Sequence, residues 1–233
     1  MKILVANCML LLALALVAPA SLAQGVAPDA LLRAVSVEVT GALRQDRGFQ
    51  AADPAKIAAL IDSRILPLFD FVHMTRLAMA RNWNLATPEQ QRVLAEEFKT
   101  LLLRTYSTAL AQYRDEIIDF KRLRAMPLAT EVTVRSEVNQ SGKEGMTLDY
   151  HLEKTAAGWK IYDVKIAGVR LVTTYRDVFA EKVRDSGVDG LIKFLEDGNR
   201  GGGSRFKSIT NSFWERSRLM YAIFQSVFGS GGQ

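Results

Sequence analysis

The hydrophobic residues of this chain change their period twice, and this change limits the fold more than any other feature. From Pro28 to Tyr113 apolar residues recur every three or four positions, as in helices with one buried face. From Ile117 to Ile166 they alternate with polar residues, as in strands that are covered on one side only. After Gly168 the helical spacing returns. This order indicates an α+β domain in which N-terminal helices pack on a curved four-stranded antiparallel sheet and C-terminal helices follow.

Capping residues set most of the predicted helix boundaries. Asp29 precedes the first apolar stripe, and Asp53 precedes a proline at the first helical position. Thr87 and Gln90 form a capping box at the start of the longest predicted helix. The predicted helices cover about residues 29–45, 54–67, 70–81, 87–113, 171–185 and 188–196, and the predicted strands about 117–123, 132–138, 146–152 and 159–166.

Residues 1–23 have the pattern of a cleaved secretory signal. A basic residue precedes an apolar run over residues 3–17, and small residues follow up to Ala23. The run is shorter than the ~20 apolar residues that a membrane-spanning helix needs. Cleavage is predicted after Ala23, with Ala20 as the second choice, so the protein is expected to be exported. The single cysteine, Cys8, lies within the run, so the exported chain is expected to contain no thiol.

The remaining chain divides into a domain, a linker and a tail. Residues 24–197 form the predicted α+β domain, residues 198–204 a glycine-rich linker, and residues 205–233 an amphipathic tail. The tail combines aromatic and basic residues, which is typical of helices at a membrane surface, although a helix packed on the domain fits the same pattern. The net charge is +5 and the basic residues of the domain are scattered among acids, which argues against nucleic acid as a partner.

The sequence contains no pattern that points to catalysis. Its two histidines are His73, in a predicted helix, and His151, which shares an alternating strand face with Asp149 and Glu153. Such a face is usually solvated rather than a metal site. Nucleophile-elbow, zinc-protease and phosphate-loop motifs are absent from the sequence. We therefore predict no catalytic residue, no metal and no cofactor, and we do not expect an enzyme.

The apolar faces of the sheet and helices have two interpretations: they cover one another in a dry core, or they enclose a cavity for an apolar ligand. Several stretches resemble one family, namely Ile65–Phe71, Met74–Ala78, Arg81–Trp83, Thr87–Gln91, Thr130–Val134, Gly158–Val164 and a series of short matches from Gly168 to Ile192. Together they are similar to the periplasmic phospholipid-binding component of the Mla system, also called the toluene-tolerance auxiliary family, whose hopanoid-associated branch is a close relative. The resemblance runs from about Pro28 to Glu196.

This resemblance implies a periplasmic carrier that maintains outer-membrane lipid asymmetry. Its cargo is phospholipid, and its implied partners are an outer-membrane lipoprotein complex and an inner-membrane ABC transporter. The alternatives are a carrier for another envelope lipid, such as a hopanoid, and an envelope interaction protein that binds no lipid.

The resemblance also implies that acyl chains lie between the helices and the sheet. The predicted lipid-binding residues come from the long helix and from two strands: Leu94, Phe98, Leu102, Tyr106, Val132, Val134, Met146, Leu148, Tyr150 and Leu152. Arg76, Arg81 and Arg104 are candidates for contact with the lipid phosphate or a partner surface, although a solvated role fits each of them as well.

Overall fold

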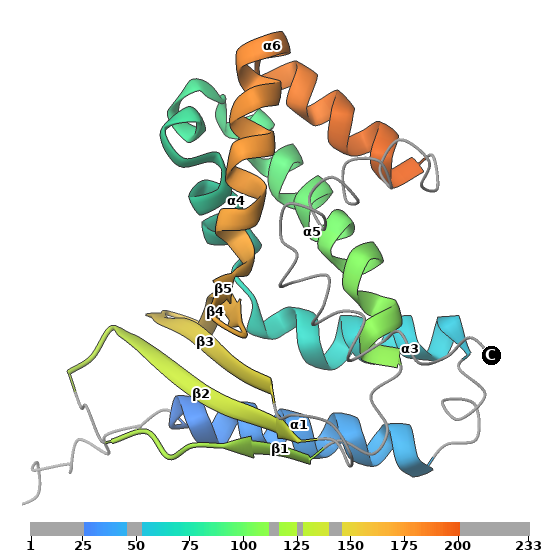
Figure 1. The fold of residues 1–233 in the computed structure, drawn as a ribbon, viewed down its shortest axis with the longest axis vertical. Helices are drawn as coiled ribbons and strands as arrows, with labels where there is room; N and C mark the ends of the chain where they lie inside the picture. Colours follow the sequence, from blue (N-terminus) through green and yellow to red (C-terminus); the bar gives the residue numbers. More distant parts are fainter. Residues whose placement is uncertain (1–25, 46–52, 112–116, 125–127, 140–145, 201–233) are drawn as a thin grey trace, which may run out of the picture.

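Figure 1 shows a computed structural model of the chain, in which a group of helices stands above one end of an antiparallel sheet. The structure describes residues 26–45, 53–111, 117–124, 128–139 and 146–200. The predicted signal peptide and tail lie outside these residues. Helices come first, strands follow and a long helix comes last in the described ranges, so the predicted α+β class is confirmed.

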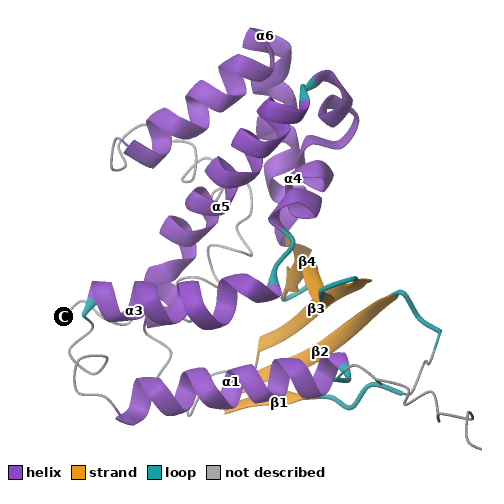
Figure 2. Ribbon diagram, turned by 180° about the vertical axis from the view of Figure 1, so that it is seen from behind, coloured by secondary structure: helices purple, strands orange, loops and turns teal. Residues whose placement is uncertain are grey.

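The first helices lie beside the sheet. α1 (Pro28–Gln45) runs along its first two strands (Figure 2). α3 (Pro54–Leu60) continues directly into the π-helical turn η1 (Ile61–Ile65) and the short 3-10 helix η2 (Leu66–Leu68). The Asp53 carboxylate accepts a hydrogen bond from the Ala55 N–H at 3.0 Å, so the predicted cap is confirmed.

The upper helical group begins with α4 (Phe71–Met79), η3 (Ala80–Leu85) and α5 (Pro88–Ala111). The Asp70 carboxylate accepts a hydrogen bond from the His73 N–H at 2.7 Å and caps α4. The predicted capping box opens α5. The Gln90 N–H donates to Thr87 Oγ1 at 3.2 Å, and the Thr87 N–H donates to Gln90 Oε1 at 2.9 Å.

The sheet contains five antiparallel strands in sequence order, whereas the sequence predicted four. They are β1 (Ile117–Phe120), β2 (Glu131–Asn139), β3 (Met146–Thr155), β4 (Gly158–Ile166) and β5 (Val169–Arg170). The short fifth strand forms because Ala167 and Gly168 have positive φ angles of 45° and 91°. These angles allow a two-residue turn that pairs Val169 with Ile166.

α6 (Leu171–Arg200) leads from the sheet into the upper helical group. Gly187, with φ 70° and ψ −174°, interrupts it at the break that the sequence predicted between residues 185 and 188. The helix then continues to Arg200, so residues 198–200 are helical and do not belong to a linker. Asn199 explains the longer helix, because its Nδ2 donates to the Glu97 carbonyl at 2.9 Å and to Glu97 Oε2 at 2.7 Å.

A buried carboxylate fixes the start of α6 to the sheet. Asp163 of β4 is fully buried, and its Oδ1 accepts hydrogen bonds from the N–H groups of Val164 at 2.9 Å and Val172 at 3.1 Å. Its Oδ2 accepts a hydrogen bond from Arg170. Every oxygen of this buried charge therefore has a partner, and the helix cannot turn relative to β4 without breaking these bonds.

Most buried apolar side chains of the described residues form two clusters, one in the upper helical group and one against the sheet. The upper cluster comprises Met74, Ala78, Met79, Trp83, Ala86, Leu94, Phe98, Leu101, Leu102, Leu171, Val172, Tyr175, Phe179, Val183, Val188, Leu191 and Leu195. The lower cluster comprises Leu32, Phe120, Val132, Val134, Leu152, Ile161 and Val164. Phe69 packs against both clusters, and its backbone forms a bridge with Ile161.

Candidate functional site

One face of the sheet is apolar, and the strand register produces it. Residues of β2 are alternately buried and more exposed, and the buried set includes Val132 and Val134. Tyr150 of β3 lies opposite Val134, and Leu152 opposite Val132. We call this surface the inner face: Ile118, Phe120, Val132, Val134, Ser136, Val138, Met146, Leu148, Tyr150, Leu152, Ile161, Val164 and Ile166. All six strand residues of the predicted lipid site belong to it.

A groove of about 1120 Å³ opens between α1 and the edge strand β1. One side of the groove is a face of α1, and the other side is the end of β1 with the residues that follow it. The lining residues are Asp29, Ala30, Arg33, Ala34, Val37, Asp119, Phe120, Lys121, Arg122 and Leu123. Phe120 belongs both to this lining and to the inner face. The groove therefore borders the apolar surface and gives it a charged edge.

The charges in the groove are partly paired. Arg33 Nη2 donates to the Phe120 carbonyl oxygen at 2.6 Å, and its guanidinium carbon lies 5.8 Å from the centroid of the Phe120 ring. Lys121 Nζ lies 2.8 Å from Asp119 Oδ2 and 2.9 Å from Glu137 Oε2. These hydrogen bonds raise the pKa of Lys121 and lower that of Asp119. The groove thus presents charges of both signs next to an apolar surface, and Arg33 is held against Phe120.

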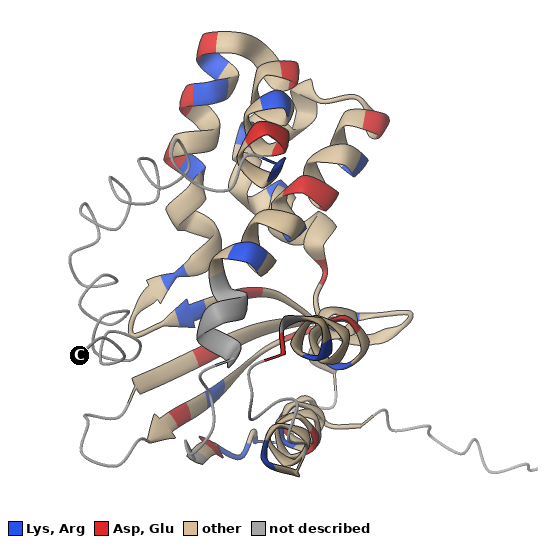
Figure 3. Cartoon of the chain, turned by 90° about the vertical axis from the view of Figure 1, so that its right-hand side faces the viewer, with Lys and Arg blue, Asp and Glu red and all other residues tan. Residues whose placement is uncertain are grey.

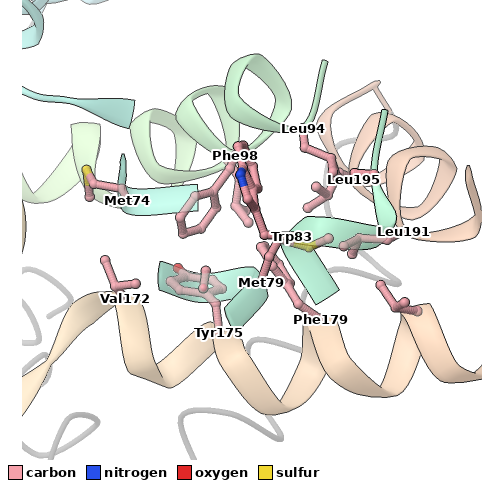
Figure 4. Packing of buried hydrophobic residues seen from close by; sticks show 14 of the residues in the cluster. Met74, Met79, Trp83, Leu94, Phe98, Val172, Tyr175, Phe179, Leu191 and Leu195 are labelled. Atoms are coloured by element: carbon pink, nitrogen blue, oxygen red, sulfur yellow. The ribbon is translucent and has the colours of Figure 1, made fainter. Parts of the chain in front are cut away.

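The long-helix residues of the predicted site whose side chains the structure describes do not belong to the cluster against the sheet. The structure places three of them in the upper cluster: Leu94, Phe98 and Leu102. The Phe98 ring packs edge-on against Tyr175 and Phe179 of α6, with centroid distances of 5.0 and 5.2 Å (Figure 4). The expected arrangement is wrong because an apolar stripe identifies the buried face of a helix but not its partner. The Tyr106 side chain lies outside the described residues, and contact of all four with lipid stays a prediction.

The three arginines predicted to contact phosphate lie on the upper helical group. Arg76, Arg81 and Arg104 are exposed, and none of them lines the groove. The Arg76 guanidinium carbon lies 5.9 Å from the centroid of the Trp83 ring. Acidic and basic residues are interspersed along these helices (Figure 3). The basic residues that line the groove are instead Arg33, Lys121 and Arg122.

The outer face of the sheet is polar and is held by ion pairs. Arg135 Nε lies 2.6 Å from Asp149 Oδ1, and Arg135 Nη2 lies 3.2 Å from Asp149 Oδ2. The hydrogen bonds from Arg135 lower the pKa of Asp149 despite the opposing effect of its burial. Lys165 adds a weaker contact at 3.8 Å. This face stabilises the sheet and leaves the opposite face for apolar contacts.

Both histidines lie next to Tyr162, with the His73 ring stacked on the phenol ring and the His151 ring tilted relative to it. The ring centroids of His73 and Tyr162 are 4.5 Å apart, and those of His151 and Tyr162 are 6.2 Å apart. His73 Nδ1 lies 2.7 Å from Glu153 Oε1. Burial lowers the pKa of His151. Among the described residues, no three His, Cys, Asp or Glu side chains are grouped closely enough to hold a metal ion.

Sequence reasoning missed three residues of this region. Ser136 is the inward residue of β2 between Val134 and Val138, so the alternation itself contained the signal. Arg33 and Phe120 were not identifiable, because their roles depend on α1 docking against β1. The structure brings all three to the boundary between the groove and the inner face.

An apolar surface with a charged border has the polarity pattern of an amphipathic ligand. None of the helices described in the structure is both long and apolar enough to cross a membrane.

Comparison with known proteins identifies the family of this chain. The sequence profile described as MlaC protein matches residues 33–197. The chain belongs to the MlaC family. The family resemblance predicted from the sequence is therefore confirmed, and MlaC proteins are non-enzymatic lipid carriers.

Two relatives show how similar this MlaC-family chain is to known proteins. Toluene tolerance protein ttg2D of Pseudomonas putida is 23% identical over 163 residues, which cover 70% of this chain and 75% of that protein. A solved structure of the phospholipid-binding protein from Ralstonia solanacearum, in complex with a phospholipid, is 40% identical with a TM-score of 0.67. That match covers 73% of this chain and 96% of the Ralstonia chain.

Proposed function

We propose that this MlaC-family protein is a periplasmic phospholipid carrier. It shuttles lipid between an outer-membrane lipoprotein complex and an inner-membrane ABC transporter, and so helps to maintain outer-membrane lipid asymmetry. The observation that carries the proposal is the apolar inner face bordered by the charged groove between α1 and β1. The phospholipid complex of the similar Ralstonia protein supports it.

A carrier of this kind solves a problem of solubility. Two acyl chains contain roughly 30 methylenes, and at ~0.8 kcal/mol each their exposure to water costs about 25 kcal/mol. Valine, leucine and isoleucine side chains of the inner face replace the bilayer interior as the surroundings of these chains. Because the bilayer and the protein are then close in free energy, the direction of transport depends on the partner complexes.

The direct test is the identity of the bound lipid. Protein purified from its native envelope should contain phospholipid when its extract is examined by mass spectrometry, and delipidated protein should take up phospholipid from vesicles. A hopanoid in the extract would replace the proposed cargo. Delipidated protein that acquires no lipid from any vesicle would contradict the carrier function.

A variant of the inner face links that activity to the site. Leu148 is partly buried in the lower cluster, and Leu148→Trp should reduce the lipid bound per protein. If lipid normally fills the space, the lipid-free variant should lose less stability than the roughly 1–3 kcal/mol expected for an overpacked dry core. Leu85→Trp is the control, because Leu85 is 65% exposed in η3. A destabilised Leu148→Trp protein that retains all its lipid would place the acyl chains elsewhere.

Export and membrane contact form part of the proposal. The signal over residues 1–23 should be absent from the intact mass of envelope-purified protein. The tail, residues 205–233, should increase binding to anionic vesicles more than to neutral ones through its basic and aromatic residues. A tail deletion that leaves vesicle binding unchanged but lowers thermal stability would favour a tail packed on the domain.

A further inference from the structure

The inner face contains one hydroxyl that has no hydrogen-bond partner. Ser136 of β2 is fully buried between Val134 and Val138, and its Oγ makes no hydrogen bond. Buried hydroxyls in folded proteins nearly always have a partner, and an unmade bond is destabilising. A serine on an otherwise apolar strand face therefore needs an explanation other than packing.

A second hydroxyl lies beside it. Tyr150 of β3 occupies the position diagonal to Ser136, since Val134 is its direct partner across the strands. Burial raises the pKa of the Tyr150 phenol, and the nearby Ser136 hydroxyl opposes this rise to a smaller extent. The phenol is therefore protonated and able to donate. The Ser136 hydroxyl has no hydrogen-bond partner, so its O–H group is available to a ligand, and the Tyr150 phenol lies close enough to contribute a second donor.

The two hydroxyls lie next to the charged groove. Phe120 of β1 pairs directly with Ser136, one strand spacing or about 4.8 Å away. The Phe120 ring is 6.0 Å from the Tyr150 ring and has the Arg33 guanidinium carbon 5.8 Å from its centroid. The order across the sheet is thus a cation, an aromatic ring, two hydroxyl donors and then aliphatic side chains.

This order matches the chemical order of a glycerophospholipid, which is phosphate, glycerol esters and acyl chains. We propose that the Ser136 and Tyr150 hydroxyls donate hydrogen bonds to an ester carbonyl oxygen of the bound lipid, so that the protein selects ester-linked lipids. The inference rests on the proposed carrier function and adds a specificity-determining contact to it. A neutral carbonyl suits this position, because a phosphate would lose its hydration among apolar side chains.

The experiment compares two lipids that differ only in the carbonyls. Delipidated protein is titrated with vesicles of dioleoyl-phosphatidylglycerol and with vesicles of its dioleyl ether analogue. The wild-type protein should bind the diester about 10-fold more tightly, which corresponds to the net gain of one or two hydrogen bonds. Ser136→Ala combined with Tyr150→Phe should remove this preference by weakening diester binding about 10-fold relative to diether binding.

A control variant separates this contact from general damage. Thr75→Val also removes a fully buried hydroxyl, but this one bonds the Phe71 carbonyl within α4. It should leave the preference for the diester intact. Equal binding of diester and diether by wild-type protein would overturn the inference, and so would a preference that survives in the double variant. Failure to bind either lipid would instead contradict the carrier function.

A second measurement avoids dependence on the stability of the variants. The infrared carbonyl band of a diester lipid labelled with carbon-13 at its esters should contain a component at lower wavenumber when the lipid is bound to wild-type protein. This component reports a hydrogen-bonded carbonyl. A bound lipid whose carbonyl band matches that of esters without a hydrogen-bond donor would overturn the inference.

Discussion

Phe98 provides the sharpest test of which cluster holds the protein together and which receives lipid. Its side chain is fully buried in the upper cluster and makes edge-on contacts with Tyr175 and Phe179. Truncation of a buried phenylalanine costs about 3–5 kcal/mol, and each aromatic contact adds roughly 0.5–1.5 kcal/mol to its burial. We therefore expect Phe98→Ala to lie at the upper end of the range, at about 4–5 kcal/mol.

Urea unfolding of the lipid-free protein measures this loss. For a chain of this size it corresponds to a fall in Tm of about 8–20 °C. Phe98→Leu keeps most of the volume and should cost about 1–1.5 kcal/mol, so it remains available if the alanine variant does not fold. Leu85→Ala, at an exposed position of η3, should change stability by less than about 0.5 kcal/mol.

The same variants are then examined for bound lipid. The amount of phospholipid per folded protein should equal that of the wild type, because the inner face belongs to the other cluster. A variant with nearly normal stability and little lipid would refute this reasoning. It would place the acyl chains between α5 and α6, in agreement with the sequence-based prediction for the long helix.

Three further predictions concern polar residues of the sheet. Asp163→Ala should lower the free energy of unfolding by about 2–5 kcal/mol, because it leaves two buried N–H groups without an acceptor. Asp163→Asn can keep Oδ1 as an acceptor and should lower it by about 1–2 kcal/mol. Equal losses for the two variants in denaturant unfolding would contradict this prediction. Burial lowers the pKa of His151, so its contribution to the free energy of unfolding should be fully present above pH ~6.5 and decrease as the pH falls below that value. His151→Gln should make the free energy of unfolding less dependent on pH in this range. Wild-type stability that does not change from pH 7 to pH 5 would argue against it. Hydrogen bonds from Arg135 lower the pKa of Asp149. The wild-type protein should therefore be more stable than Asp149→Asn above pH ~4, and this difference should disappear as the pH falls through the lowered pKa. A difference that persists at pH ~2 would be inconsistent with this pairing.

Local signals in the sequence were sufficient for most of the secondary structure. The Thr87–Gln90 capping box, the Asp53 cap and the break at Gly187 depend on neighbouring residues, and all three are present. Strand alternation likewise identified the inner-face residues of β2 and β3. The fifth strand was missed because its two residues are too few to show a period, although Ala167 and Gly168 form the turn that creates it.

The candidate site was less predictable, since it depends on which elements meet. Leu94 and Phe98 have the same apolar spacing whether their helix packs on a sheet or on another helix, and here the partner is α6. The groove depends on the contact between α1 and β1, which are more than 70 positions apart in the chain. Ser136 was visible in the alternation, but its lack of a hydrogen-bond partner becomes evident only in three dimensions.

The division of the buried side chains into two clusters has a consequence for the kinetics of cargo exchange. α6 contributes eight buried residues, whereas α1 contributes only Pro28, Leu32 and Leu43. Local opening costs least where few apolar contacts are lost, so amide protons of α1 should exchange with solvent much faster than those of α6. Separation of α1 from the sheet exposes the inner face while the upper cluster stays intact. The residence time of a bound molecule should therefore follow the opening rate of α1, and the chain does not need to unfold to release it.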